Sequence, residues 1–291
     1  MKLATFTHKG VTRVGIVVNE AIVDVTVENA DLPQNMIDVL EGGEPVLAVL
    51  RSLEQSGAPS LPLAEVHLEA PVLRPPKFLA IGLNYADHIE ETGLERPEFP
   101  SFFNKQSTCV IGPHDPIHAP RVSAKLDYEG ELGFVIGRRC RHVPRERARD
   151  VIAGYLIVND VTVRDWQARS PTWTLGKSFD THGPTGPWIV TADEIGDPHA
   201  LDIETWVNEE RRQSTNTRHM IFNCFQQVEV LSTAFTLEPG DIISTGTSSG
   251  VGVMMTPRGY VKAGDVVRVT IERIGAIENP VIEEPDDTAR L

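Results

Sequence analysis

Short apolar segments rich in β-branched residues recur from residue 78 onward, and they do not alternate regularly with helical segments. The strand-like segments are residues 78–81, 132–136, 155–158, 188–190, 242–245 and 266–271. Patterns typical of helices are fewer, at residues 85–91, 145–151, 161–169 and 222–234. Regular alternation of strand and helix would indicate a TIM barrel or a doubly wound parallel sheet. The order of the segments therefore predicts an α+β fold that is mainly β.

Residues 1–70 differ from the rest of the chain, and a proline-rich connector follows them. Short β-branched runs within residues 1–25 predict a strand meander, and the apolar pattern over residues 36–55 predicts helix. Prolines stiffen the connector, because proline fixes φ and keeps the preceding residue out of helical conformation. We therefore predict a small N-terminal α+β domain over residues 1–70 and a larger domain over residues 71–282. Residues 283–291 are acidic and lack an apolar period, so we expect them to form a disordered tail.

Charge and cysteine content exclude several classes of protein. The 291 residues include 27 Lys and Arg against 41 Asp and Glu, a net charge of −14. Proteins that bind nucleic acids or anionic membranes present basic surfaces, so we expect neither partner. The three cysteines are widely spaced, which is typical of isolated thiols in a reducing compartment. With no signal-peptide core at the N-terminus and no apolar run near the ~18 residues of a membrane span, we expect a soluble cytoplasmic protein.

Three carboxylates near two strand ends form a candidate metal site. Glu129 and Glu131 lead into the strand-like segment 132–136, and residues two apart on a strand share one face. Asp160 follows the strand-like segment 155–158. Carboxylates without thiolate or imidazole partners suit Mg²⁺ or Mn²⁺ better than Zn²⁺. The alternative for Glu129 and Glu131 is an exposed acidic strand start.

Two helical patterns carry further candidates, each with an ordinary alternative. If the segment after Asp160 is helical, Arg164 and Gln167 share a face with Asp160 beside the metal ion. The alternative is a surface ion pair between Asp160 and Arg164. In the helical segment 85–91, Glu91 is three residues after His88 and can orient its imidazole as a general base, although surface His–Glu pairs are common.

Two lysines and one decoy motif complete the candidates. Lys177 and Lys105 both lie near aromatic residues, and the alternative for each is a surface lysine. Residues 246–250 match the G-x-S-x-G pattern of serine hydrolases. No helical pattern follows them and the last histidine of the chain is His219, so this motif does not indicate a catalytic serine.

Taken together, six segments in order resemble the fumarylacetoacetate hydrolase (FAH) superfamily. They are residues 82–88 (GLNYADH), 103–105 (FNK), 129–135 (EGELGFV), 159–167 (NDVTVRDWQ), 176–179 (GKSF) and 240–247 (GDIISTGT). The N-terminal segment, residues 1–70, resembles the small domain of two-domain bacterial members. One departure is Ser248-Ser249, where many relatives have proline after Thr-Gly-Thr.

The resemblance implies a FAH-like β-roll catalytic domain, a homodimer and a set of residue roles. Glu129, Glu131 and Asp160 match the ligands of Mg²⁺ (or Mn²⁺), and His88 and Glu91 match a water-activating dyad. Lys177 matches the lysine beside the reacting carbonyl, and Thr247 matches the hydroxyl of the Thr-Gly-Thr turn. Lys105, Arg164 and Gln167 match substrate contacts. The three cations and a divalent ion outweigh the three carboxylates, which is consistent with a small anionic substrate.

The reaction expected from this resemblance is the metal-dependent hydrolysis of a 2,4-dioxo acid, such as an acylpyruvate or a fumarylpyruvate-like acid, to pyruvate and a carboxylic acid. A decarboxylase of oxaloacetate or an isomerase of ring-cleavage products is the alternative, because both use the same pyruvate enolate. A complete His88–Glu91 dyad favours hydrolysis, since decarboxylation needs no activated water. A non-catalytic metabolite-binding protein is a third alternative. Residues 92–103 contain Gly93, Pro97 and Pro100 and have no clear period, so we predict a mobile lid.

Overall fold

Twelve strands form one large sheet in the computed structural model, which describes residues 1–288. They are β1 Lys2–His8, β2 Val11–Val18, β3 Ala21–Asp24, β4 Leu61–Pro62, β5 His67–Leu68, β6 Phe78–Gly82, β7 Ser101–Lys105, β8 Val110–Ile111, β11 Gly130–Ile136, β12 Ile152–Asn159, β14 Gly183–Thr191 and β17 Ile242–Ser244. Along the main path the order is β4-β3-β2-β1-β14-β12-β11-β17-β6-β7, while β5 pairs with β1 and β8 with β14. Strands β11 and β12 are buried along nearly their whole length, as strands inside a covered sheet are.

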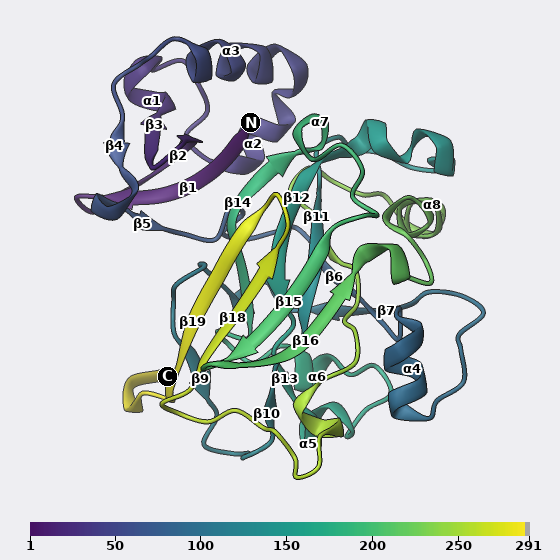
Figure 1. The fold of residues 1–291 in the computed structure, drawn as a ribbon. Coiled ribbons are helices and arrows are strands. Elements are labelled where there is room, and N and C mark those ends of the chain that lie inside the picture. The colour runs from purple at the N-terminus through teal and green to yellow at the C-terminus, as the bar shows by residue number, and fades with distance from the viewer. Residues whose placement is uncertain (289–291) are drawn as a thin grey trace.

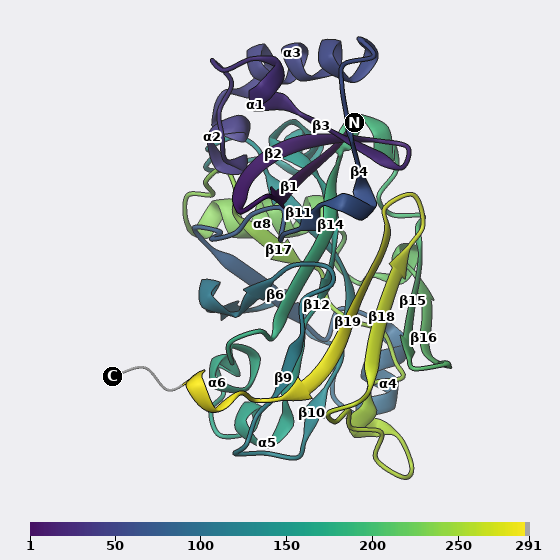
Figure 2. The same ribbon diagram turned by 90° about the vertical axis from the view of Figure 1, so that its left-hand side faces the viewer.

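A second sheet of five strands covers the centre of the first. It contains β9 Ile117–Ala119, β15 Asp202–Val207, β16 Glu210–Asn216, β18 Val266–Ile271 and β19 Gly275–Glu283, in the order β16-β15-β18-β19-β9. Buried residues alternate with more exposed ones along β15 and β18, so one face of this sheet points inward. Phe134 and Ile157 of the large sheet share a buried cluster with Ile203 and Val269 of the second. Figures 1 and 2 show the second sheet lying against β11, β12 and β14.

Helices are short and lie around the sheets. They are α1 Val25–Glu28, α2 Met36–Glu41, α3 Gly43–Gln55, α4 Ala86–Thr92, α5 Arg164–Gln167, α6 Thr174–Lys177, α7 Ala192–Ile195 and α8 Cys224–Ala234. The two-stranded pair of β10 Leu126–Asp127 and β13 Thr162–Val163 lies near α5 and α6 (Figure 1). The prediction of an α+β fold that is mainly β is therefore confirmed.

The N-terminal segment, residues 1–70, continues the large sheet instead of packing as a detached unit. Strand β1 pairs antiparallel with β14, with Lys2 opposite Val190 and Leu3 opposite Ile189. Leu3 and Ile16 also share a buried cluster with Leu156 and Ile189 of the larger part. Figure 1 shows this segment at the upper left, joined to the rest through β1 and β14. The large sheet and a buried cluster therefore extend across residue 70. The division of the chain into two domains at that residue stays a prediction.

The predicted tail begins inside a strand. Glu283 is the last residue of β19, and Asp286–Thr288 form a 3₁₀ turn. Arg121 donates hydrogen bonds to the Glu284 carbonyl and to Asp286. The expectation of disorder from residue 283 is therefore wrong for residues 283–288, because strand pairing and the hydrogen bonds of Arg121 order this segment. Residues 289–291, the rest of the predicted tail, lie outside the described residues. Within residues 1–288, no helix has the length and apolar character needed to cross a membrane.

Candidate active site

Most of the residues predicted to form a site line one pocket of about 330 Å³. Residues of α4, α5 and α6, which Figure 1 labels, contribute to the pocket, and its lining includes His88, Glu129, Arg164, Gln167, Lys177 and Thr247. The other four, Glu91, Lys105, Glu131 and Asp160, contact residues of this lining or lie beside them. Segments that are far apart in the chain, from α4 to the turn after β17, therefore meet in one place.

Glu129, Glu131 and Asp160 converge at the paired ends of β11 and β12. Gly130 of β11 lies opposite Asn159 of β12, so the residues that flank this pair are brought together. One carboxylate oxygen from each of the three lies within 4.8 Å of the others, and all three residues are buried.

Gly130 is needed between the two glutamates. A Cβ at this position would lie 2.1 Å from Thr205 Oγ1 of the facing sheet. The absence of a side chain therefore allows β11 to pack closely on β15 while Glu129 and Glu131 point into the site.

The carboxylate cluster fits a hard divalent cation. Glu131 accepts hydrogen bonds from the Ser244 hydroxyl at 2.6 Å and the Gly246 N–H at 2.8 Å, but no cationic side chain among the described residues forms an ion pair with it. Burial, and then the charges of Asp160 and Glu129, raise the pKa of Glu131 well above its usual range. A cation placed among the three would relieve this repulsion, and oxygen ligands suit Mg²⁺ and Mn²⁺.

Two buried lysines neutralise the other two carboxylates. Lys177 Nζ lies 2.8 Å from Glu129 Oε2 and 2.6 Å from Asp160 Oδ2. Lys105 Nζ lies 2.7 Å from Asp160 Oδ1 and also donates to the Lys177 carbonyl. Burial alone would lower the pKa of Lys177, but Asp160 and Glu129 outweigh it and raise the pKa. The alternative of surface lysines is wrong, since both side chains are almost fully buried.

Arg164 reaches the site from a much shorter helix than the sequence predicts. Residues 162–163 form β13 against β10, and only Arg164–Gln167 are helical. The β-branched residues Val161, Thr162 and Val163 favour strand once a partner strand is available. The predicted helical face joining Asp160 to Arg164 is therefore absent, and so is the alternative ion pair between them among the described contacts.

Asp127 is a residue of the candidate site that the sequence reasoning missed. Arg164 Nε lies 2.8 Å from Asp127 Oδ2, and Arg164 Nη1 lies 2.7 Å from Glu129 Oε1 and 3.2 Å from Gln167 Oε1. Burial would raise the pKa of Glu129, but Lys177 and Arg164 lower it to about 2. The alternation of Asp127, Glu129 and Glu131 was the signal that could have found this residue. The negative charge of Asp127 also reduces the net positive charge that the sequence predicts for the site with a divalent ion bound.

His88 and Glu91 form the predicted contact on α4. His88 Nδ1 lies 3.2 Å from Glu91 Oε2, and Glu91 Oε1 accepts the Gly250 N–H at 3.0 Å. Glu91 is thus held from both sides, with His88 facing the pocket that Glu129 also lines. If His88 Nδ1 carries the proton donated to Glu91, its Nε2 is left as a proton acceptor.

Thr247 lies in the turn after β17, where its hydroxyl is already engaged. Thr247 Oγ1 accepts a hydrogen bond from Gln213 Nε2 at 2.8 Å and lies 3.1 Å from the Gly130 carbonyl, to which it donates. To donate to a substrate oxyanion, this hydroxyl must first rotate away from Gly130.

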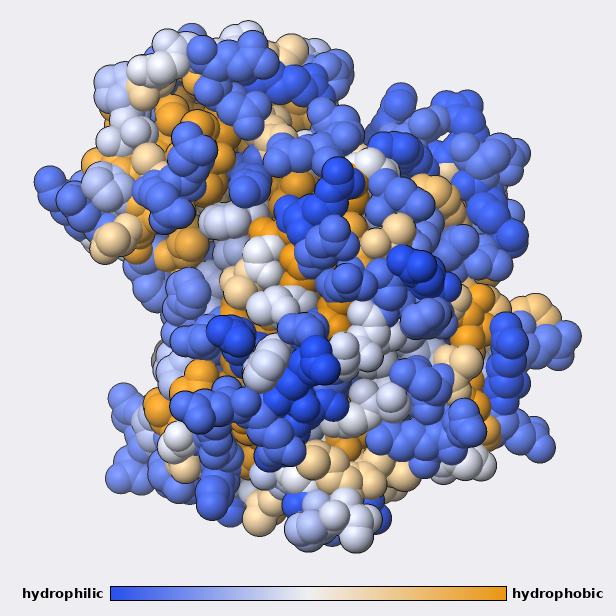
Figure 3. All heavy atoms as spheres, in the orientation of Figure 1, coloured by the Kyte–Doolittle hydropathy of each residue, from blue (hydrophilic) through white to orange (hydrophobic). Residues whose placement is uncertain are grey.

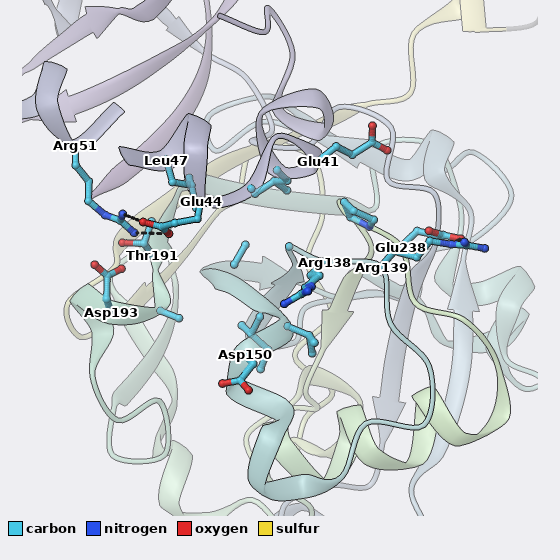
Figure 4. Close-up of a pocket in the computed structure, with 18 residues that line it drawn as sticks. Glu41, Glu44, Leu47, Arg51, Arg138, Arg139, Asp150, Thr191, Asp193 and Glu238 are labelled. Carbon is cyan, nitrogen blue, oxygen red and sulfur yellow. Dashed lines mark hydrogen bonds and ion pairs between the residues drawn. The ribbon is translucent and has the colours of Figure 1, made fainter. Parts of the chain in front are cut away.

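A larger cavity, of about 850 Å³, lies between α3 and the body of the protein (Figure 4). Arg51 and Glu44 of α3 form an ion pair on one side, and Arg138 and Asp150 lie on the other. In the part of the chain that the structure describes, the residues predicted to form the site do not line this cavity. Its volume alone therefore does not make it the better candidate for catalysis.

Known proteins resemble this chain in sequence and in structure. The mitochondrial oxaloacetate tautomerase of Xenopus laevis is 41% identical over 274 residues, which are 93% of this chain and 86% of that protein. The crystal structure of maleylpyruvate hydrolase from Sphingobium sp. SYK-6, in complex with manganese(II) and pyruvate, is 34% identical with a TM-score of 0.83. A 2-hydroxyhepta-2,4-diene-1,7-dioate isomerase from Mycobacterium marinum is 33% identical with a TM-score of 0.78. Each structure covers 98% of this chain, which covers all of both.

These relatives are enzymes, and they confirm the expected fold and family. The family model of the fumarylacetoacetate hydrolase C-terminal domain matches residues 77–282, which include every residue of the candidate site. This chain therefore belongs to the fumarylacetoacetate hydrolase family.

Proposed function

We propose that this protein is a divalent-metal-dependent hydrolase that cleaves the C3–C4 bond of a 2,4-dioxo acid to pyruvate and a carboxylic acid. The observation that carries the proposal is the placement of the His88–Glu91 dyad beside the carboxylate cluster, in one pocket. The manganese(II) and pyruvate bound by the similar maleylpyruvate hydrolase support the same type of site.

Glu129, Glu131 and Asp160 would hold the divalent ion. When bound, such an ion acts as a Lewis acid that polarises the 2-oxo group and stabilises negative charge. Arg164 lines the pocket and would bind the substrate carboxylate after a shift of its side chain, because its Nη2 has no hydrogen-bond partner among the described residues but is buried in this conformation. Gln167 lines the same pocket beside it.

The protein's own groups can carry the proton through a balanced reaction. His88 Nε2 takes a proton from water, and the resulting hydroxide adds to the C4 carbonyl. The C3–C4 bond then breaks and the acyl group leaves as a carboxylic acid. The electron pair of the broken bond stays on C3 and forms the pyruvate enolate. His88 returns its proton to C3 of the enolate. The Lys177 ammonium lies beside this centre and can stabilise developing negative charge.

Oxaloacetate tautomerisation is a second candidate, favoured by the 41% identity to a protein of that name. It also needs an acid–base group to move a proton between carbon and oxygen of an enolate. The hydrolase proposal requires water activation in addition, and this requirement separates the two. Decarboxylation of oxaloacetate, which the sequence left open, needs neither activated water nor the dyad.

The substitution His88→Ala tests the proposal. We expect it to lower kcat for hydrolysis of 2,4-dioxopentanoate by about 10²–10⁴-fold, since that is the typical contribution of a general base. Any oxaloacetate decarboxylation should be largely spared. Glu91→Gln should act in the same direction more mildly, because the imidazole remains but is less basic and less well oriented. His8→Ala, in the N-terminal unit, is the matched control.

Calorimetric titration with Mn²⁺ establishes that the variants retain metal binding. Equal loss of both activities in His88→Ala with metal binding intact would contradict the proposal. His88 would then serve the enolate step, and oxaloacetate tautomerisation would become the first candidate. Pyruvate release followed with a coupled dehydrogenase, together with the loss of dioxo-acid absorbance, gives the rate of hydrolysis.

A further inference from the structure

Polar and apolar side chains both line the candidate active-site pocket, and the apolar ones form a wall. That wall consists of Leu83, Leu94, Phe103, Trp173 and Val253. The rings of Phe103 and Trp173 meet edge to face with their centroids 5.5 Å apart, and Lys177 Nζ lies 5.1 Å from the centroid of the Phe103 ring. The apolar wall therefore begins directly beside the charged groups of the site.

The cations that line the pocket are already committed to the protein's own carboxylates. Lys177 is paired with Glu129 and Asp160, and Arg164 is paired with Asp127 and Glu129. Arg164 Nη2 has no partner among the described residues but is buried, so it can serve one substrate carboxylate only after the side chain shifts. A second carboxylate on the substrate would find no unpaired cation in the described lining, and burying an unpaired charge is costly.

The backbone at the apolar wall adopts costly conformations. Leu83 and Trp173 have φ values of 57° and 59°, in the left-handed region that bulky residues rarely adopt. A Cβ at Gly82 would lie 2.3 Å from Trp173 Cζ3, so the indole packs on bare backbone there. Such strain concentrates where a ligand is clamped. The position of the Trp173 ring is thus maintained against an energetic cost.

The loop after α4 adds apolar side chains next to this wall. Leu94 is 55% exposed and lines the pocket, and Phe99 in the same loop is 69% exposed. Figure 3 shows hydrophobic residues gathered over the region of α4 and the following loop, at the right of that face. The loop contains one cation, Arg96, between Glu95 and Glu98, so its net charge disfavours a second substrate carboxylate.

We infer that the substrate is a 2,4-dioxo acid with a single carboxylate, whose acyl group is uncharged and apolar. This inference rests on the proposed function and names the part of the substrate that the function leaves open. The acyl group contacts Trp173, Phe103 and Leu94, where burial of apolar surface is favourable. The pocket thereby differs from one made for a substrate with two carboxylates, such as the dioate in the name of the Mycobacterium marinum isomerase.

Two substrates of equal chain length test the inference. We expect kcat/KM for 2,4-dioxoheptanoate to exceed that for 2,4-dioxoheptanedioate by about tenfold or more with Mn²⁺ present. Trp173→Ala should lower kcat/KM for 2,4-dioxoheptanoate about tenfold, and by a clearly larger factor than for 2,4-dioxopentanoate, whose acyl group is only acetyl. Leu94→Lys should raise kcat/KM for the dicarboxylate. The matched control is Leu175→Ala, an exposed leucine outside the pocket lining.

A binding measurement separates failure of this inference from failure of the hydrolase proposal. Calorimetry with Mn²⁺ compares 2-oxohexanoate with 2-oxohexanedioate, neither of which has a C4 carbonyl to hydrolyse. Tighter binding of 2-oxohexanoate supports a site for one carboxylate and an uncharged apolar group even if no dioxo acid is cleaved. In that case the proposed hydrolysis of a 2,4-dioxo acid fails and the inferred chemistry of the binding site stands. Preference for the dicarboxylates, with that preference lost in Arg96→Ala, would overturn the inference and assign the second carboxylate to the loop arginine. Preference for the dicarboxylates that survives Arg96→Ala would also overturn it.

Discussion

Glu131→Gln should stabilise the metal-free protein and remove its response to metal. Burial and the neighbouring Asp160 and Glu129 raise the pKa of Glu131. An acid with a higher pKa in the folded than in the unfolded state contributes stability below its unfolded pKa, near 4.3, and that stability is lost as pH rises toward the folded pKa. Each pH unit in this window lowers the free energy of unfolding by up to about 1.4 kcal/mol. Glutamine keeps the shape and acceptor oxygen for Ser244 but has no charge to bury.

Metal should stabilise the wild type more than Glu131→Gln. A ligand that binds only the folded state at 100 times its Kd adds about 2.7 kcal/mol to the free energy of unfolding. Wild type at saturating Mn²⁺ should show a gain of this size, because three buried carboxylate oxygens are available within 4.8 Å. Glu131→Gln lacks one anionic ligand, so we expect less than about 1 kcal/mol at the same Mn²⁺ concentration.

Urea unfolding followed by tryptophan fluorescence measures both effects. The wild type, Glu131→Gln and the control Glu90→Gln, on the exposed side of α4, are compared at pH 5, 6 and 7 in EDTA and in MnCl₂. The gap between metal-free wild type and Glu131→Gln should widen with pH, while the control should follow wild type. An equal gain from Mn²⁺ in wild type and Glu131→Gln would refute the assignment of Glu131 as a ligand. A gap that does not depend on pH would refute the reasoning about its charge.

Two further predictions concern groups near the site. Burial lowers the pKa of His182 to about 3, so this histidine stays neutral in the folded protein. In the unfolded chain it binds a proton near pH 6.5. The free energy of unfolding therefore falls as the pH drops below 6.5, by about 2 kcal/mol between pH 7 and pH 5. Urea unfolding at both pH values should show that His182→Phe lacks this part of the pH dependence, and an unchanged dependence would disprove it. Backbone amides of residues 93–100, which form no helix or strand, should exchange hydrogen rapidly and slow when Mn²⁺ and pyruvate are added. Slow exchange without ligand, unaltered by ligand, would contradict the predicted lid.

The carboxylate cluster and the dyad could be predicted because each depends mainly on short-range rules. Residues two apart near a strand point the same way, and His88 and Glu91 are three apart on a helix. Asp160 follows the strand that pairs with β11, so one antiparallel contact, Gly130 opposite Asn159, completes the cluster. The side-chain periodicity of strands and helices is therefore enough to predict most of the contacts within the carboxylate cluster and the dyad.

The partners of the cations could not be predicted from local patterns. Lys105 reaches Asp160 across 55 residues, and Arg164 reaches Asp127 across 37. Residues 161–169 were expected to be helical, but pairing of β13 with β10 converts the first part to strand. The pairing partner, and not the segment itself, decides that conformation. For the same reason the local pattern left open whether Lys177 and Lys105 are site residues or surface lysines, since burial depends on what the rest of the chain places over them.

The pairing of β1 with β14 has a consequence for the colloidal behaviour of the enzyme. Strand β14 is flanked by β12 on one side and, at Ile189 and Val190, by β1 on the other. Without β1, the N–H and C=O groups there would form an open sheet edge made of apolar residues, which is a template for strand addition between molecules. We therefore expect the N-terminal unit to cover this edge and to reduce aggregation. A fragment that begins at residue 71 would contain every residue of the candidate site and still expose the edge that makes sheets self-associate.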